Sequence, residues 1–356
     1  MRSKNYRGKR AGEYLPPWRD RPLAKATICC SPWSSLLGKN APVSATFINV
    51  APVFLLILIG WVVARTGILN EATGDALGEF VFKIAVPMLI FHTLADAHFE
   101  GVSPFRLWCA YFAGVAVTWT AGHLIAKYAF GRDDKIGVIA GMSAAFANNV
   151  FIGLPLVGRS VGEDGLVALS ILLAIHLPLM MIVGTILMER AVVVVDGGQG
   201  RGLKTILRQV GSNLIRNPLV IALAAGLALN LSELQLTPVV NTVVTQLSNA
   251  AGPAALISIG MALTKYPVRG NIGLTGAIAA LKLVLLPAAV FSMSRLLGLS
   301  PAWTSAMVLT SSVPTGINAW LIAQRFRSGQ NIAASTISVT TAIGIISVSF
   351  WAWLLA

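Results

Sequence analysis

Ten runs of about 20 apolar residues, separated by short polar segments, constrain this chain more than any other feature of its sequence. Hydrophobic residues make up 55% of the 356 residues and charged residues 12%, whereas a soluble domain carries about 25% charged residues. About 20 apolar residues in a helix span the hydrocarbon core of a bilayer, and lipid offers no partner to an unsatisfied backbone group. The runs lack the strict alternation of a membrane β-barrel. The sequence therefore predicts an all-α membrane protein with ten transmembrane helices.

The positive charges predict how these helices are oriented. The loops after odd-numbered runs carry thirteen Lys and Arg residues and the loops after even-numbered runs carry three. The positive-inside rule places the odd loops in the cytoplasm, so we expect a multi-pass protein of the cell inner membrane with both termini periplasmic. The formal charge of +13 is then a topology signal, and not a nucleic-acid-binding surface. The predicted helices are 46–65, 77–95, 106–127, 136–158, 166–189, 213–231, 239–264, 271–296, 302–323 and 331–355.

The beginning of the chain breaks this charge pattern. Nine Lys and Arg residues precede Ser44, and this segment has no apolar region of the kind that a secretory signal needs. We interpret residues 1–44 as a basic disordered extension, which an upstream start codon would explain, and expect the folded protein to begin near Val43. A functional basic tail and a reversed topology are the alternatives.

The sequence contains an internal repeat. A shift of 166 residues places Pro52 on Pro218 and Gly60 on Gly226, and it aligns "FANNVFIGLP" with "VPTGIN". Each half holds five predicted helices, an odd number, so the second copy runs upside down relative to the first. We predict two inverted five-helix repeats, an arrangement typical of secondary transporters. The predicted organisation is 45–190 for the first repeat, 191–212 for a cytoplasmic loop and 213–356 for the second repeat.

The fourth and ninth predicted helices are interrupted by polar and helix-breaking residues. Proline cannot donate a backbone hydrogen bond, and Gly153 and Gly316 should let the chain bend. Freed backbone groups at membrane depth need protein or a water-filled cavity as a partner. Asparagine side chains can satisfy them and hold a ligand, and the N-termini of half-helices favour an anion. A simple proline kink without a ligand is the alternative.

We therefore predict a substrate site at these two interrupted helices. A Lys in the middle of the eighth predicted helix joins the candidates, since a buried charge at that depth is costly and is a functional candidate by default. The candidate substrate-binding residues are Asn148, Asn149, Pro155, Pro314, Thr315, Asn318 and Lys282.

Other titratable residues in the apolar runs have simpler interpretations. Lys282 itself has an alternative, a long side chain that reaches a polar cavity or the interface. Glu79 and Lys83 are one helical turn apart and predict a structural ion pair or side chains that extend to the membrane interface. His176 could relay protons, but we interpret it, like His92, as a hydrogen-bonded core residue. Acidic residues are absent from the centre of every predicted helix, which argues against a carrier built on a buried acidic pair.

Nothing in the sequence indicates an enzyme, a metal site or a cofactor. No HExxH, CxxC, GxSxG or Walker motif occurs, and the three cysteines and four histidines have no metal-ligand spacing. We predict no catalytic residues, no metal and no cofactor.

Several stretches together resemble the auxin efflux carrier family. They are "VAPVFLLILIGWVVARTGIL", "FVFKIAVPMLIFHTL", "NNVFIGLPLV", "RNPLVIALAAGLAL", "GPAALISIGMAL" and "SSVPTGINAWLIA", and the resemblance covers about residues 45–355. It implies ten helices in two inverted sets of five, with helices 4 and 9 crossing at prolines, and a secondary carrier of organic anions. The short loop resembles bacterial members, for which malonate and malate are implied substrates. The family's crossover residues correspond to Asn148, Asn149, Pro155, Pro314 and Asn318.

The predicted function is transport of a small carboxylate across the lipid bilayer through a site at the helix 4/9 crossing. A membrane channel or a ligand sensor that uses the same cavity is the alternative. Proton symport, antiport and uniport stay open, as does a homodimer. No nucleic-acid partner is expected.

Overall fold

The apolar runs fold into helices. In the computed structural model, residues 41–97, 103–197, 202, 208, 211–212, 215–232 and 234–356 are described. This part of the chain contains no strand beyond a single isolated β-bridge. Seven continuous helical segments in it are long and apolar enough to cross a membrane: Phe47–Arg65, Glu71–Ala95, Pro104–Ala129, Glu163–Asp196, Pro238–Lys265, Ile272–Leu296 and Gln330–Leu355.

The three remaining predicted helices differ from these seven. The run 213–231 corresponds to a shorter apolar helix of 15 residues, and the runs 136–158 and 302–323 are each interrupted. In chain order the elements are α1 (Ala41–Arg65), α2 (Glu71–Phe80), η2 (Val81–Ala85), α3 (Val86–Ala95), α4 (Pro104–Leu124), η3 (Ile125–Ala129), α5 (Asp134–Ala145), η4 (Asn149–Gly153), α6 (Leu154–Ser160), α7 (Glu163–Asp196), α9 (Pro218–Ser232), α10 (Pro238–Ala262), η5 (Leu263–Lys265), α11 (Ile272–Ala280), η6 (Leu281–Leu285), α12 (Leu286–Leu296), α13 (Pro301–Ser312), α14 (Asn318–Arg325) and α15 (Gln330–Leu355).

Two predicted segments lie partly outside the described residues. They are the predicted extension, at residues 1–40, and the predicted loop 191–212, at residues 198–201, 203–207 and 209–210. The loop begins later than predicted, because α7 continues to Asp196. Helix α7 ends at Gly197, which adopts the left-handed conformation that glycine tolerates and donates its N–H to the Val193 carbonyl at 3.2 Å.

Short polar side chains set several helix starts. Asn70 accepts a hydrogen bond from the Thr73 N–H at 2.9 Å before α2, and Asp133 accepts one from the Ile136 N–H at 2.8 Å before α5. Such caps satisfy N–H groups that have no partner within the helix. The polar breaks between apolar runs therefore also encode where the helices begin.

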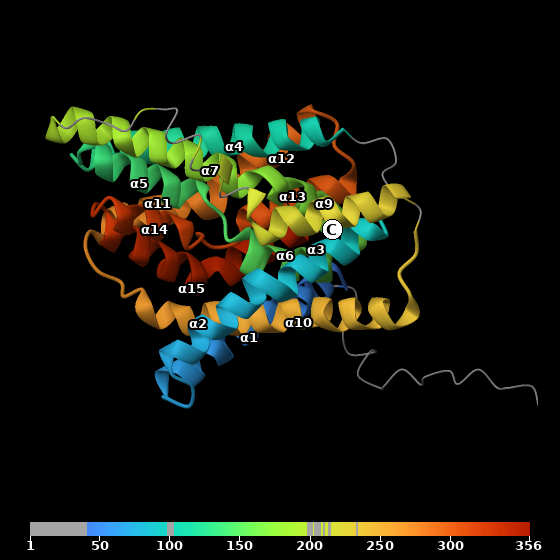
Figure 1. Cartoon of the computed structure of the whole chain (residues 1–356). Helices are drawn as coiled ribbons and strands as arrows, with labels where there is room; N and C mark the ends of the chain where they lie inside the picture. Colours follow the sequence, from blue (N-terminus) through green and yellow to red (C-terminus); the bar gives the residue numbers. More distant parts are fainter. Residues whose placement is uncertain are drawn as a thin grey trace, which may run out of the picture. The chain divides into compact units, whose positions relative to one another are not determined.

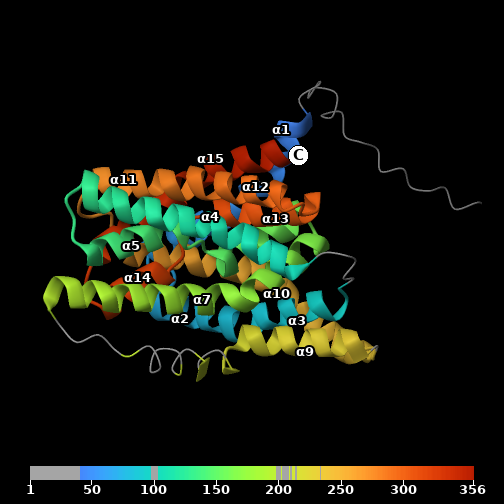
Figure 2. The same cartoon turned by 90° about the horizontal axis from the view of Figure 1, so that it is seen from above.

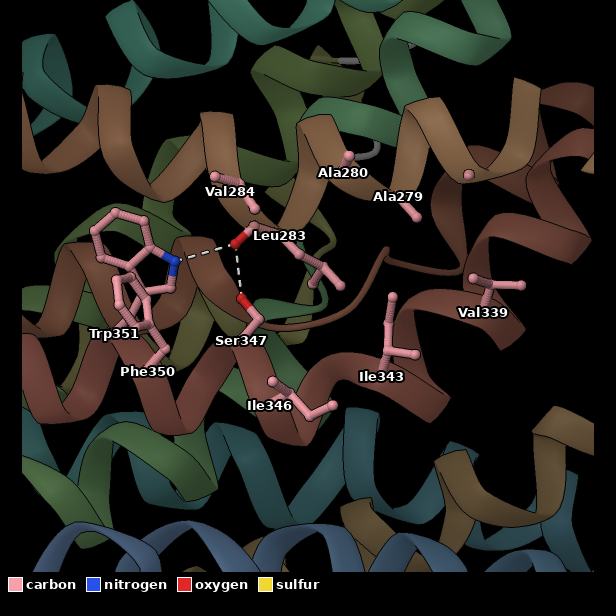
Figure 3. Close-up of a pocket in the computed structure, with 11 residues that line it drawn as sticks. Ala279, Ala280, Leu283, Val284, Val339, Ile343, Ile346, Ser347, Phe350 and Trp351 are labelled. Atoms are coloured by element: carbon pink, nitrogen blue, oxygen red, sulfur yellow. Dashed lines mark hydrogen bonds between the residues drawn. The ribbon is translucent and has the colours of Figure 1, made fainter. Parts of the chain in front are cut away.

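Proline at the start of α12 exposes a carbonyl that α15 then satisfies. Pro287 has no N–H, so the Leu283 carbonyl four residues earlier lacks its helical donor. Ser347 Oγ donates to this oxygen at 2.7 Å and Trp351 Nε1 donates at 3.0 Å. Figure 3 shows both side chains reaching from α15 to Leu283. The proline thus fixes α15 against the α11–η6–α12 segment.

Glycines allow α1 and α10 to pack at very short distance. A Cβ atom at Gly60 would lie 2.2 Å from the Ile257 carbonyl oxygen, and one at Gly260 would lie 2.0 Å from the Ile57 carbonyl oxygen. Only residues without a side chain fit there, as in many membrane helix pairs. This contact ties together two helices that are far apart in sequence.

The helices pack into layers that bring the two halves of the sequence side by side. Helix α3 lies against α9 and α10, and α4 lies against α5 and α12. Figures 1 and 2 show most of the long helices running in roughly the same direction, with α7 along α5 and α13. A large hydrophobic core connects the layers.

The charged pairs lie at helix ends or on exposed faces. Glu79 and Lys83 form the predicted ion pair, and both side chains are exposed. Lys127 donates to an Asp134 carboxyl oxygen at 2.8 Å, and His123 Nε2 lies 3.4 Å from the same oxygen. The hydrogen bond from Lys127 holds the pKa of Asp134, at the polar start of α5, below its usual range.

Candidate functional site

The two interrupted segments meet at their breaks. Helix α5 ends at Ala145 and helix α13 ends at Ser312. Between them, Ala147 and Thr315 form an antiparallel β-bridge. The Asn148 N–H donates to the Pro314 carbonyl at 2.9 Å, and the Gly316 N–H donates to the Phe146 carbonyl at 2.8 Å. Each break thus satisfies backbone groups that the other leaves free.

The two asparagines of the first break have different surroundings. Asn148 Oδ1 accepts from the Phe151 N–H at 3.3 Å and caps the helix that begins at η4. Asn149 Nδ2 donates to the Tyr111 hydroxyl at 3.2 Å, and its Oδ1 accepts from the Thr310 hydroxyl at 3.0 Å. Asn149 therefore links α4 to α13 through the break, and each polar atom of its amide already has one protein partner.

Residues of the second break attach it to α5 and α15. The Thr315 hydroxyl donates to the Ser143 carbonyl at 2.8 Å, and the Thr315 N–H donates to Thr340 Oγ1 at 3.1 Å. Pro314 is buried against α15, where a Cβ atom at Gly344 would lie 3.0 Å from its Cγ. Both residues fix the crossing in place.

The proline and glycine of the first break act differently from the prediction. Pro155 lies in the first turn of α6, several residues after the break, and the chain is already helical from Asn149 onward. Gly153 serves close packing, because a Cβ atom there would lie 2.6 Å from Thr310 Oγ1. Gly316 has the same function, since its Cβ would lie 2.9 Å from Phe146 Cδ1. Neither glycine has a positive φ angle.

Lys282 belongs to η6, and its side chain reaches the C-terminal end of α13. Its side chain is fully buried, and its Nζ donates to the Ser311 carbonyl at 2.5 Å. The last carbonyls of a helix have no helical partner and carry partial negative charge, which favours a cation. Lys282 therefore stabilises the C-terminal end of the half-helix α13. The predicted alternative is a side chain that reaches a polar cavity or the interface; in the structure this side chain is fully buried and does not line the cavity at the crossing.

A cavity of about 270 Å³ lies at the crossing. Among the predicted site residues, Asn148, Asn149 and Asn318 line it, whereas Pro155, Pro314, Thr315 and Lys282 do not. Its walls come from η2, α7, α9, α14 and both breaks: Phe82, Phe146, Ala147, Asn148, Asn149, Val150, Phe151, Leu173, His176, Leu177, Leu219, Gly316, Ile317, Asn318 and Leu321. A few polar groups in an otherwise apolar wall are typical of a small-molecule site.

Two larger cavities have walls of a different character. One of about 530 Å³ lies between α11–η6–α12 and α15 and is apolar apart from Ser347 and Trp351, whose polar atoms both bond to Leu283 (Figure 3). The other, of about 760 Å³, lies between α1, α15 and the end of α10, with Arg65 on its wall. Neither contains residues of the crossing.

His176 lines the crossing cavity; it is buried, as the sequence-based interpretation expects, but its Nε2 is not hydrogen-bonded to the described residues. We expected a hydrogen-bonded core histidine, but its Nε2 has no hydrogen-bond partner among the described residues. His92, by contrast, does have a partner, since its Nε2 lies 3.2 Å from Thr245 Oγ1. The sequence offers one signal for His176, a lone titratable residue in an apolar run, but only the structure shows that its Nε2 has no hydrogen-bond partner among the described residues.

Comparisons with known proteins identify the family to which this chain belongs. The sequence model of the family described as "Membrane transport protein" matches residues 45–352. The chain belongs to this family. It is the family of the auxin efflux carriers, so the resemblance noted in the sequence is confirmed. The chain is a transport protein and not an enzyme, and it is a multi-pass protein embedded in the bilayer.

Curated relatives match along most of their length. The chain is 25% identical over 309 residues to a protein of Rhizobium meliloti named "Putative malonate transporter", covering 84% of this chain and 92% of that protein. It is 26% identical over 309 residues to an uncharacterized transporter of Methanothermobacter thermautotrophicus, covering 85% and 96%. It is also 26% identical over 315 residues to an uncharacterized transporter of Methanocaldococcus jannaschii, covering 85% and 96%.

Proposed function

We propose that this membrane transport protein is a secondary transporter that moves a small organic anion, a carboxylate such as malonate or malate, through the cavity at the crossing. The observation that carries the proposal is the bridge between the two breaks beside a cavity lined by Asn148 and Asn318. The name of the Rhizobium meliloti relative supports malonate as the first substrate to test.

The chemistry of the cavity suits a carboxylate. Asn318 is half-buried on the wall, and its side chain makes no hydrogen bond to the described residues. Asparagine amide groups and the free N–H groups at the start of a helix can donate to a carboxylate, and the helix dipole adds a favourable potential. In this proposal Asn148 and Asn318 hold the substrate, and Asn149 supports the site through Tyr111 and Thr310.

The proposal includes the membrane arrangement. Ten membrane-crossing segments form two inverted five-helix repeats, with the broken segments α5–α6 and α13–α14 as the fourth and ninth. The protein resides in the inner membrane with both termini on the periplasmic side. Support comes from the 166-residue repeat and from the distribution of Lys and Arg. Proton coupling and homodimerisation stay predictions.

The decisive experiment is transport by the purified protein in proteoliposomes. Labelled malonate should accumulate or exchange in a saturable manner, and unlabelled mono- and dicarboxylates should compete in order of their fit. Liposomes without protein and protein with Asn318→Ala serve as controls. Currents that do not saturate with substrate would indicate a channel, and binding without flux would indicate a sensor. Absence of both binding and flux across the panel would contradict the proposal.

A further inference from the structure

His176 is a buried histidine, and one of its two ring nitrogens has no hydrogen-bond partner among the described residues. The residue is 2% exposed. Its Nε2 is closed to solvent and has no hydrogen-bond partner among the described residues. More than 90% of buried polar groups in native structures are paired, because an unpaired one is costly. Nine buried side-chain atoms of the described residues lack a partner, and among the residues that carry them only His176 lines the cavity at the crossing.

Three aromatic rings pack around the imidazole of His176, and they provide no hydrogen bond to its Nε2. Phe146 and Tyr111 meet it edge to face, with ring centroids 5.0 and 5.5 Å away, and Phe112 stacks on it at 6.1 Å. Phe146 belongs to the first break, and the Tyr111 hydroxyl already accepts from Asn149. The ring is therefore positioned by the same residues that build the crossing.

The imidazole of His176 forms part of the cavity wall. His176 lines it together with Asn148 and Asn318, and no Lys, Arg, Asp or Glu belongs to the wall. A second negative charge on a ligand would meet no cationic side chain on the cavity wall, and burying an unpaired charge is very unfavourable. One carboxylate can use the asparagine amides and helix starts. The remaining polar group at the wall, His176, then suits a neutral hydrogen-bonding group.

We propose that His176 binds the ligand directly, and that the cavity takes an organic acid with one carboxylate and one neutral hydroxyl or protonated carboxyl group. The carboxylate lies at the asparagines and the neutral group pairs with Nε2. A hydroxyl can donate to or accept from this nitrogen, so it suits either tautomer of a neutral imidazole. This inference rests on the proposed function and adds a substrate class and a specificity-determining residue to the same site.

The test compares two acids that differ by one hydroxyl, 3-hydroxypropionate and propionate. Their affinities are measured by calorimetry on the purified full chain, on His176→Gln and on His176→Phe, which retains an aromatic ring. His92→Gln is the matched control, since His92 lies outside the cavity wall. The wild type should bind 3-hydroxypropionate about three- to tenfold more tightly, as expected for one neutral hydrogen bond. Both His176 variants should lose this preference and keep their affinity for propionate, and His92→Gln should retain it.

Several results would overturn the inference. A hydroxyl preference that persists in the His176 variants places the hydroxyl elsewhere. An equal loss of affinity for both acids assigns His176 a structural role. Equal binding of the two acids by the wild type overturns the inference without any variant. If neither these acids nor malonate binds to the wild type, the proposed function fails together with the inference, whereas binding without hydroxyl preference affects the inference alone.

Discussion

Replacing Asn149 by Ala should destabilise the protein more than it affects any ligand. The substitution removes the hydrogen bond to the Tyr111 hydroxyl and the one from Thr310, and both of these partners are completely buried. An unsatisfied buried polar group costs about 1–3 kcal/mol. Two such groups predict a loss of about 2–4 kcal/mol, in the lower part of the summed range because the adjacent cavity can admit water.

Asn318→Ala is the matched comparison at the same cavity. Asn318 makes no side-chain hydrogen bond to the described residues, so its removal should change the free energy of unfolding by less than about 0.5 kcal/mol. If it donates to a carboxylate, the affinity for malonate should fall by about ten- to a hundredfold, since such a bond contributes about 1.5–3 kcal/mol. The two asparagines should thus separate stability from binding.

The assay is equilibrium unfolding in mixed micelles with increasing dodecyl sulfate, followed by the fluorescence of the nine tryptophans, with malonate affinity measured in parallel. A double-mutant cycle with Thr310→Val isolates the Asn149–Thr310 pair, and we expect a coupling of about 0.5–1.5 kcal/mol. Normal stability of Asn149→Ala combined with lost affinity would refute this assignment and make Asn149 a ligand-binding residue. Strict additivity in the cycle would show that the Thr310 bond contributes nothing.

Three further predictions concern packing, charge and topology. Gly60→Ala and Gly260→Ala should each lower the unfolding free energy by about 1–3 kcal/mol through overpacking, whereas Gly276→Ala, where a Cβ meets nothing within 4 Å, should be neutral in the same unfolding assay. The folded-state pKa of Asp134 is lowered, so the contribution of this carboxylate to stability is complete above the usual carboxyl range and is lost as the pH falls through the folded-state value. The thermal stability of the wild type should therefore drop more on acidification than that of Asp134→Asn. Parallel stability curves for the two proteins would contradict this. A cysteine added after Ala356 in a cysteine-free background should react with an impermeant thiol reagent in intact cells, and labelling only after lysis would reverse the proposed topology.

The sequence predicted the helical class and most element positions because these depend on local properties. Apolar runs of sufficient length are helical in lipid whatever their neighbours are. The start of α5 at Asp134, close to the predicted start at 136, depends on a cap by the preceding Asp133. The end of α7 was predicted at 189, whereas the helix continues to Asp196 and stops at the left-handed Gly197. The asparagines at the breaks were found for the same reason, since polar residues in apolar runs stand out.

Tertiary structure alone decided what each of these residues contacts. Asn149 and Asn318 are both asparagines in an interrupted helix, so the sequence does not distinguish their roles. In the structure, Asn149 is hydrogen-bonded to Tyr111 and Thr310, which come from distant segments. The sequence predicts that Lys282 is a buried charge. Its partner is the backbone carbonyl oxygen of Ser311, which no sequence pattern identifies. Hydrogen bonding depends on which atoms approach within about 3 Å, and the sequence fixes that distance only through the packing of the whole helix assembly. His176 shows the same limit, because the absence of a partner is a property of its surroundings and not of the residue.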